Sequence, residues 1–205
     1  YLANVTMIDD KVGEIMVALE NKGQLDNTVI IFTSDHGDCL TDHGHSQKWT
    51  MYDQVTRVPM IARCPGRFPA GGRTDALVQL MDVGPAILEL AGAKSPDNLE
   101  AESLLPALEG KAFNGREYVF AEQVRDLNYT EGNFQTMVRS REWKLVHFLD
   151  EQLGQLFNLQ DDPDEFENLW KSHEHKDIRD KLLGVLRDWH IQSQLQTSKW
   201  AEKWR

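Results

Sequence analysis

Apolar residues recur every three or four positions over the first 21 residues, which predicts a helix of about five turns with one apolar stripe. Gly23 supplies the left-handed residue that often follows a helix, so the helix should end near Lys22. The stripe consists of Val5, Ile8, Val12, Ile15 and Leu19.

The run from Thr28 to Thr33 consists mainly of β-branched and aromatic residues and shows no alternation with polar ones. Such a run predicts a strand buried on both faces, the kind found in parallel sheets. A second short strand is predicted from Val58 to Arg63, with Pro59 near its beginning, where a missing N–H is tolerated. Helix, tight loop and buried strand together favour an α/β layer architecture.

Two further helices are predicted before the pattern changes. One runs from Asp82, as the N-cap, to Gly92, which ends it. The other is short and covers Ser103 to Leu108, with Pro106 in its first turn.

After about Phe113, short apolar runs alternate with polar turns, which predicts a small antiparallel sheet. An amphipathic helix that could cover one face of this sheet follows between Ile178 and Trp189. We therefore divide the chain into an α/β part, residues 1–112, and a small α+β part, residues 113–205. The four predicted strands are Tyr118 to Ala121, Thr136 to Arg139, Trp143 to Phe148 and Gln155 to Asn158.

Composition excludes several classes of partner. The 205 residues include 22 basic and 33 acidic ones, and the net charge of −11 comes without a Lys/Arg cluster, so nucleic acid is not an expected partner. No apolar run approaches the roughly 18–20 residues of a membrane span. Two cysteines are too few for a disulfide framework, so they do not indicate a compartment.

The segment with the clearest chemistry is Ser34-Asp35-His36-Gly37-Asp38, directly after the first predicted strand. In open α/β sheets ligands bind beyond the carboxyl ends of strands, where Asp35 and His36 could turn toward one cation. At least two further ligands would be needed to complete such a site. The structural alternative is that Asp35 caps a turn and His36 hydrogen-bonds to the backbone.

A polar loop from Thr41 to Lys48 joins this segment to the next strand and carries His43, His45 and Lys48. A long loop rich in histidine, with one lysine, is typical of a site lined for an anion. A solvated loop lysine is the alternative for Lys48. We expect a structural role for His43, whereas His45 could either donate to a substrate or stiffen the loop.

Several motifs together resemble the sulfatase family of the alkaline phosphatase superfamily, in family order over nearly the whole chain. They are Asp9-Asp10-Lys11-Val12-Gly13, Asp26-Asn27-Thr28, Thr33 to Asp38, Asp42-His43-Gly44 with Lys48, Arg57-Val58-Pro59, Met81 to Pro85 with Leu90-Ala91-Gly92, Ser103 to Pro106, and Leu156 to Leu159 with Asp162 to Glu165 through Asn168-Leu169.

The resemblance implies the C-terminal part of an alkaline-phosphatase-like α/β sandwich, followed by a small antiparallel-sheet subdomain with a C-terminal helix. It also implies a divalent cation, usually calcium with magnesium or manganese as alternatives, bound in part by Asp35 and His36. Lys48 would contact the sulfate group and act in catalysis, with His45 as a second candidate catalytic residue. This is coherent physically, because a cation and an ammonium group stabilise the negative charge that builds up as a sulfate ester hydrolyses.

The chain departs from the family at the nucleophile, a formylglycine made from the first residue of Cys/Ser-X-Pro-X-Arg. Cys64-Pro65-Gly66-Arg67 does not fit, because its proline and arginine each fall one position too early. We therefore expect the N-terminal half, with the nucleophile and the remaining metal carboxylates, to be a separate polypeptide or to be replaced by self-association.

These observations predict a segment of a sulfuric ester hydrolase that acts on a sugar or aryl sulfate and is inactive alone. A phosphodiesterase or phosphonate monoester hydrolase of the same superfamily is the nearest alternative. A non-catalytic binding fragment is the alternative from another class.

Overall fold

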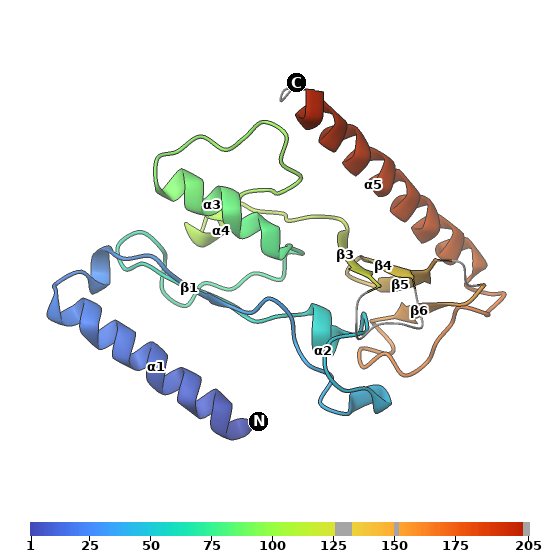
Figure 1. Cartoon of the computed structure of the whole chain (residues 1–205), viewed down its shortest axis with the longest axis horizontal. Helices are drawn as coiled ribbons and strands as arrows, with labels where there is room; N and C mark the ends of the chain where they lie inside the picture. The colour runs from blue at the N-terminus through green and yellow to red at the C-terminus, as the bar shows by residue number, and fades with distance from the viewer. Residues whose placement is uncertain (126–132, 150–151, 203–205) are drawn as a thin grey trace.

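The computed structural model describes residues 1–125, 133–149 and 152–202 and has a mixed α/β fold (Figure 1). Each predicted helix and strand is present, and the predicted fold class is confirmed. The bounds agree within a few residues except for the last helix, which continues 13 residues beyond Trp189 to Glu202. Up to residue 112 the elements are α1 (Leu2–Asn21), η1 (Leu25–Asn27), β1 (Ile30–Thr33), η2 (Asp42–Gly44), α2 (Asp53–Thr56), β2 (Met60–Arg63), η3 (Leu80–Asp82), α3 (Val83–Leu90) and α4 (Leu105–Leu108). The later elements are β3 (Val119–Val124), β4 (Phe134–Arg139), β5 (Trp143–Phe148), β6 (Gly154–Asn158) and α5 (Lys176–Glu202).

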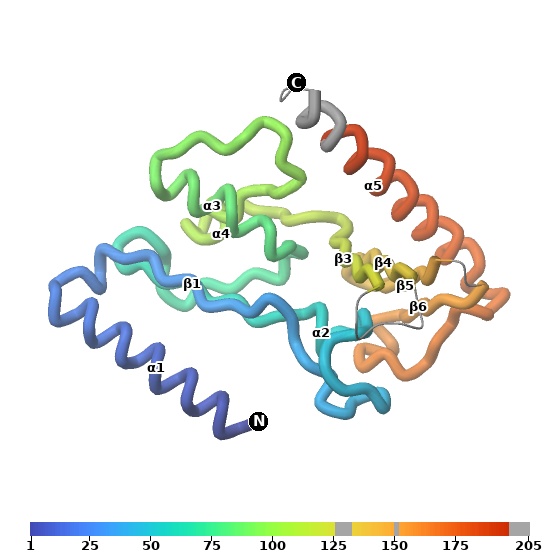
Figure 2. The backbone as a smooth tube through the Cα atoms, viewed as in Figure 1, coloured from blue at the N-terminus to red at the C-terminus, as the bar shows by residue number. Residues whose placement is uncertain are grey.

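The pairing of β1 corrects one prediction. β1 pairs with β2 in antiparallel register, from Ile30 opposite Arg63 to Thr33 opposite Met60, and the described residues add no third strand. Its residues are at most partly buried, so β1 is not the doubly buried parallel strand that its composition predicts. The reason is that the described chain covers neither face with a full layer. Figure 2 follows the backbone out along β1, through α2 and back along β2.

Helix α1 forms as predicted, but its apolar stripe is not covered. None of its residues is buried, and Val5, Ile8 and Ile15 are each about half or more exposed. In Figure 1 the helix lies apart from the sheet of β3 to β6. Among the described helices none is long and apolar enough to cross a membrane.

Strands β3 to β6 form an antiparallel sheet in chain order, and helix α5 packs on one face of it (Figure 1). Because successive side chains of a strand point to opposite faces, every second residue of β4, β5 and β6 points toward α5. These residues and two leucines of the helix make the largest buried apolar cluster. Its fully buried members are Val138, Leu145, Leu156, Leu182 and Leu186.

The opposite face, here called the α2 face, packs against the segment that leads into α2. Met137 and Val146 of this face form a second apolar cluster with Met51. The face also carries two aromatic side chains, Phe148 and the buried Phe157. Its remaining side chains are polar, and two of them, Gln135 and Lys144, are fully buried. The sheet is therefore apolar toward α5 and mixed toward the loop that carries the candidate site. Over β4 to β6 the α2 face consists of Gln135, Met137, Arg139, Lys144, Val146, Phe148, Gln155 and Phe157.

Asp82 occupies the residue before α3, but its side chain does not cap that helix. The carboxylate is buried and accepts hydrogen bonds from Arg116 Nε at 3.1 Å and Arg116 Nη2 at 2.5 Å. It also accepts the backbone N–H groups of Gln79 and Glu102, both at 2.8 Å. Asp82 is therefore the N-cap residue of α3 by position, as predicted, but its carboxylate binds the long-range Arg116 in place of the helix N–H groups. This ion pair joins α3 to the segment entering β3.

Candidate functional site

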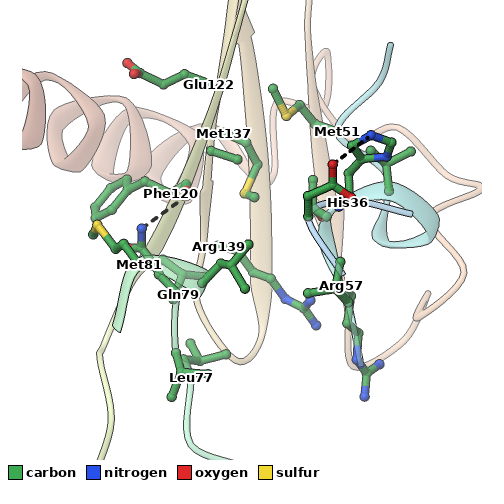
Figure 3. A pocket seen from close by; sticks show the side chains of 18 of the residues that line it. His36, Met51, Arg57, Leu77, Gln79, Met81, Phe120, Glu122, Met137 and Arg139 are labelled. Atoms are coloured by element: carbon green, nitrogen blue, oxygen red, sulfur yellow. Dashed lines mark hydrogen bonds and ion pairs between the residues drawn. The ribbon is translucent and has the colours of Figure 1, made fainter. Parts of the chain in front are cut away.

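A cleft of about 910 Å³ lies between the end of β1, the segments around α2 and the edge of the sheet at β3 and β4 (Figure 3). Figure 3 shows His36 and Arg57 on one side of this cleft and Gln79 and Phe120 on the other. Four basic side chains line it, against three carboxylates, in a protein whose net charge is −11. The four are Lys48, Arg57, Arg139 and Arg141. Arg139 is bound to Asp53, so the basic groups available to an anionic ligand are the other three.

Asp35 and His36 lie together in this cleft, directly after β1. His36 Nε2 is 3.5 Å from Asp35 Oδ2, and the backbone N–H of His36 donates to Asp35 Oδ1 at 3.0 Å. That hydrogen bond lowers the pKa of Asp35, so the carboxylate is ionised near neutral pH. Asp35 is largely exposed, so the charge is available to a ligand.

The tautomer of His36 follows from its second hydrogen bond. His36 Nδ1 lies 2.8 Å from the carbonyl oxygen of Gly37, and because a carbonyl can only accept, Nδ1 carries the proton. The neutral ring therefore presents the lone pair of Nε2 on the side of Asp35. This is the arrangement that orients a metal-binding histidine.

The donor set fits half of a divalent cation site. Two atoms that bind one Ca²⁺ at about 2.3–2.6 Å and at right angles lie roughly 3.3–3.7 Å apart, which matches the Oδ2–Nε2 distance of 3.5 Å. Within the described ranges no group of three or more His, Cys, Asp or Glu side chains could hold a metal ion. The pair therefore needs additional ligands from outside these residues.

Gly37 positions the pair by packing directly on α2. Its N–H donates to the carbonyl of Val55 at 2.8 Å, and a Cβ on Gly37 would lie 1.8 Å from the carbonyl oxygen of Gln54. No larger residue fits here without moving backbone. The glycine of the Asp-His-Gly segment is thus required by a close approach, and α2 sets the direction in which the two preceding side chains leave β1.

Lys48 lines the same cleft, whereas His45 does not. The Nζ of Lys48 lies 5.8 Å from the centre of the Trp49 ring, and among the described residues it makes no ion pair. An ammonium group without a carboxylate partner is free to contact an oxyanion. His45 is exposed and its ring lies 6.2 Å from that of Tyr52, so its catalytic role stays a prediction.

His43 is held by aromatic packing, in line with the structural role expected for it. Its ring stacks on Tyr52 with centroids 3.8 Å apart and planes 3° from parallel. Burial raises the pKa of Tyr52, whose hydroxyl accepts a hydrogen bond from Gln155 Nε2 at 3.1 Å. The loop from 41 to 48 is therefore attached to the α2 face of the sheet.

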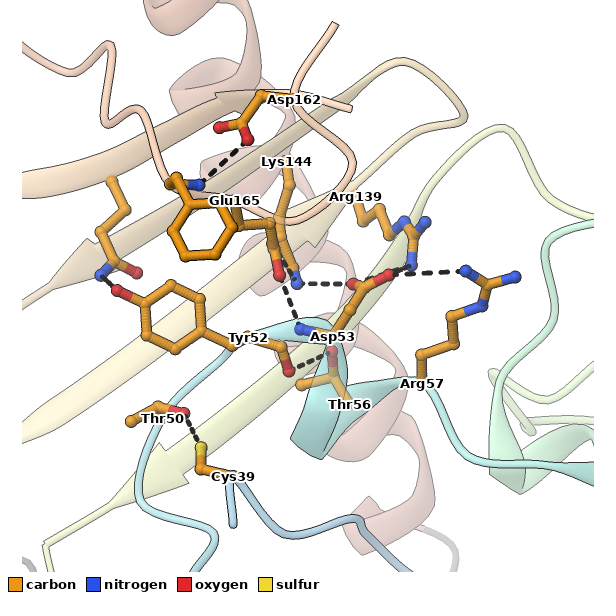
Figure 4. A network of polar contacts seen from close by, with 12 residues as sticks. Cys39, Thr50, Tyr52, Asp53, Thr56, Arg57, Arg139, Lys144, Asp162 and Glu165 are labelled. Atoms are coloured by element: carbon orange, nitrogen blue, oxygen red, sulfur yellow. Dashed lines mark hydrogen bonds and ion pairs between the residues drawn. The ribbon is translucent and has the colours of Figure 1, made fainter. Parts of the chain in front are cut away.

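A buried charge network that the sequence analysis did not identify lies behind the cleft (Figure 4). Lys144 Nζ is 2.7 Å from Asp53 Oδ1 and 2.6 Å from Glu165 Oε1, and both Lys144 and Glu165 are fully buried. Arg139 Nη1 donates to both oxygens of Asp53 at 2.9 and 2.8 Å. Two features of the sequence could have indicated this network: a lysine inside the apolar strand from Trp143 to Phe148, and the motif from Asp162 to Glu165.

The chain matches a protein family described as N-sulphoglucosamine sulphohydrolase, C-terminal, over residues 41–192. It is 30% identical over 192 residues to an N-acetylglucosamine-6-O-sulfatase of Bacteroides thetaiotaomicron, a match that covers 92% of this chain and 34% of the relative. The chain thus spans about a third of the length of that relative.

Solved structures with the same fold cover most of the chain. One is a complex of a protein with its substrate D-glucosamine-2-N,6-O-disulfate, with a TM-score of 0.86, 29% identity, and coverage of 95% of this chain and 40% of that one. Another is a phosphonate monoester hydrolase from Silicibacter pomeroyi, with a TM-score of 0.86, 28% identity, and coverage of 94% and 40%.

Proposed function

This chain belongs to the sulfatase family, and on that premise we propose that it provides the cation-binding and sulfate-binding side of a site that hydrolyses sulfuric esters. The observation that carries the proposal is the placement of Asp35, His36 and Lys48 on one cleft, with Asp35 Oδ2 and His36 Nε2 3.5 Å apart. A pair of cation ligands and a lysine beside one another place positive charge next to an anionic ester, which stabilises the charge that develops during its hydrolysis.

Asp35 and His36 are two of the ligands of a divalent cation, which we propose is Ca²⁺. When bound, the ion supplies positive charge against the oxygens of the ester group. The carbonyl of Gly37 accepts the Nδ1 proton of His36, which leaves the lone pair of Nε2, 3.5 Å from Asp35 Oδ2, free for the ion. Lys48 contacts an oxygen of the sulfate group and stabilises the negative charge that develops during hydrolysis.

The proposed substrate is a sulfate ester on a sugar. The support is that one solved relative binds D-glucosamine-2-N,6-O-disulfate and another relative is an N-acetylglucosamine-6-O-sulfatase. Arg57 and Arg141 line the same cleft and are exposed, so they are available to the polar groups of such a substrate. The nucleophile and the remaining cation ligands come, in this proposal, from polypeptide outside these 205 residues, and the chain alone is inactive.

The test uses the complete protein and glucosamine 6-sulfate. Asp35→Asn and His36→Ala should each weaken Ca²⁺ binding, measured by calorimetry, and abolish most of the sulfate release. Lys11→Met, on the exposed surface of α1, is a matched charge-changing control and should alter neither. Wild-type Ca²⁺ affinity in Asp35→Asn would contradict the proposal. Sulfate release by the 205-residue chain on its own would contradict the proposed inactivity.

A second candidate function is phosphonate monoester hydrolysis. It is favoured by the structural similarity to the phosphonate monoester hydrolase from Silicibacter pomeroyi, which is as close in TM-score as the sulfatase-type complex. Paired assays with an aryl sulfate and an aryl phosphonate on the complete protein separate the two. A clear preference for the phosphonate would replace the sulfatase proposal.

A further inference from the structure

The short helix α2 is the element on which the Asp35–His36 turn rests. The turn contacts it through the Gly37 N–H to Val55 hydrogen bond and through the close approach of Gly37 to the Gln54 carbonyl. A helix of four residues does not hold its own position, because so few hydrogen bonds do not offset the cost of forming a helix. The position of α2 must therefore be set by what binds it.

Side chains of the α2 face bind the segment from Trp49 to Asp53, which connects Lys48 to α2. Gln135 Nε2 donates to the carbonyl of Trp49 at 3.1 Å, and the Asp53 carboxylate binds Lys144 and Arg139. A further contact, from Gln155 to the Tyr52 hydroxyl, comes from β6. Three strands of the sheet thus hold five consecutive residues beside the site.

Lys144 is the centre of this attachment. It is fully buried, and it bridges Asp53 at the start of α2 to Glu165, whose Oε2 in turn accepts the backbone N–H of Asp53 at 2.7 Å (Figure 4). A buried ammonium is tolerated only when its partners stay in place, so the geometry of the three groups is fixed. Every other cation on Asp53 is more exposed than Lys144.

We propose that Lys144 is a positioning residue for the cation site: through Asp53 and α2 it fixes the turn that carries Asp35 and His36, although it does not line the cleft. This inference rests on the proposed function, since it assigns Lys144 to the same cation-binding pair. Two hydrogen bonds connect the small antiparallel sheet to the cation ligands through α2. Lys144 donates to Asp53 at the start of α2, and the Gly37 N–H donates to the carbonyl of Val55.

The direction in which Lys144→Met changes the Ca²⁺ affinity distinguishes a positioning role from a long-range effect of the lysine's charge. Lys144→Met removes a positive charge, so a purely electrostatic effect at a distance would strengthen Ca²⁺ binding. Loss of positioning predicts the opposite, a Ca²⁺ affinity at least about tenfold weaker, the scale seen when groups behind metal ligands are removed. Affinity is measured by calorimetry with Ca²⁺ on the complete protein, with folding checked by circular dichroism.

Arg63→Met is the matched control. Arg63 lies on β2 and pairs with Asp26 at 3.0 Å, so this variant also loses one positive charge but leaves α2 untouched. Its Ca²⁺ affinity should be unchanged or slightly higher. Affinity that is unchanged or tighter in folded Lys144→Met overturns the proposal.

Asp53→Asn carries the test if Lys144→Met does not fold, because it keeps the Lys144–Glu165 pair and the shape of the side chain. Its Ca²⁺ affinity should be weaker than that of the wild type at about 0.1 M salt and also at about 1 M salt. At about 1 M salt, interactions between exposed charges more than roughly 3 Å apart are screened, so a loss that persists there is not a long-range effect of the removed charge. Unchanged affinity, or a loss that disappears at high salt, overturns the proposal. If Asp35→Asn itself binds Ca²⁺ like the wild type, the proposed function fails; if only the Lys144 and Asp53 variants do, this inference alone fails.

Discussion

The carbonyl oxygen of Gln54 occupies the place where Gly37 would carry a side chain, only 1.8 Å from an ideal Cβ position. Two segments nearly twenty residues apart are therefore in backbone contact beside the candidate cation ligands. The Asp-His-Gly segment needs its glycine for this approach rather than for an unusual backbone angle, since Gly37 is not among the residues with positive φ.

Gly37→Ala should therefore be destabilising. The added methyl group forces β1's end and α2 apart, and overpacking of this kind costs about 1–3 kcal/mol. The free energy of unfolding from urea titration measures the effect, and the Ca²⁺ affinity should fall with it. Gly13→Ala is the matched control, because a Cβ on Gly13 meets nothing within 4 Å in the helix interior, so the change should stabilise by about 0.5–1 kcal/mol. Equal stability of the two variants would contradict the argument.

Asp53 should make stability depend on pH in the acid range. Burial by itself would raise the pKa of Asp53, but the charge and hydrogen bond of Lys144 and the charge of Arg139 outweigh burial and hold that pKa below its ordinary value of 3.8. A carboxyl whose pKa is lower in the folded than in the unfolded protein stabilises the fold above about pH 4 and loses this contribution as the pH falls through the folded-state pKa.

The free energy of unfolding of the wild type should thus decrease below about pH 4 more steeply than that of Asp53→Asn. At neutral pH the variant should be less stable by about 1.5–3 kcal/mol, the range for hydrogen bonds to charged groups. Asp26→Asn, which removes an exposed partner of Arg63, should cost less than about 1 kcal/mol. Parallel pH curves for wild type and Asp53→Asn would refute this role for the carboxylate.

Local periodicity predicted the strands and the longer helices, but not α2, whose four residues are too few to show a period. The position of Asp35 and His36 after β1 follows from the strand alone. The partner of β1 did not follow, because an apolar run does not specify which strand lies beside it or in which direction. Asp82 illustrates a second limit, since a helix-start aspartate is the same in sequence whether it caps the helix or binds Arg116, 34 residues away.

The buried network was beyond sequence reasoning for a different reason. Lys144 and Asp53 are 91 residues apart, and their contact depends on the register of β5 and on the path of the Trp49–Asp53 segment across the sheet. Within β5 the neighbouring Leu145 and Val146 are as buried as Lys144, because both faces of the sheet are covered, so no polar–apolar alternation marked the lysine.

Leu186→Ala tests the packing of α5 on the sheet. Leu186 is 3% exposed in the cluster with Leu145 and Leu156, and truncation of a buried leucine costs about 2–5 kcal/mol through lost burial and the cavity left behind. Leu195→Ala lies on the same helix at a position that is 56% exposed and should change stability by less than about 0.5 kcal/mol. Thermal and urea unfolding of both variants measure the difference, and similar losses would mean that α5 does not pack as described.

Lys48→Met separates sulfate contact from cation binding. If the Nζ group stabilises charge on the sulfate oxygens, its removal should lower kcat/KM for glucosamine 6-sulfate by about 10²–10³-fold, as for other lost donors to a developing oxyanion. Ca²⁺ affinity should not fall, because Lys48 is a cation and supplies no ligand to the Asp35–His36 pair. Lys94→Met, an 85% exposed lysine outside the cleft, should keep wild-type kinetics. A Lys48→Met protein with unchanged kcat/KM would remove the lysine from the proposed site and leave the cation pair to be judged by Asp35→Asn alone.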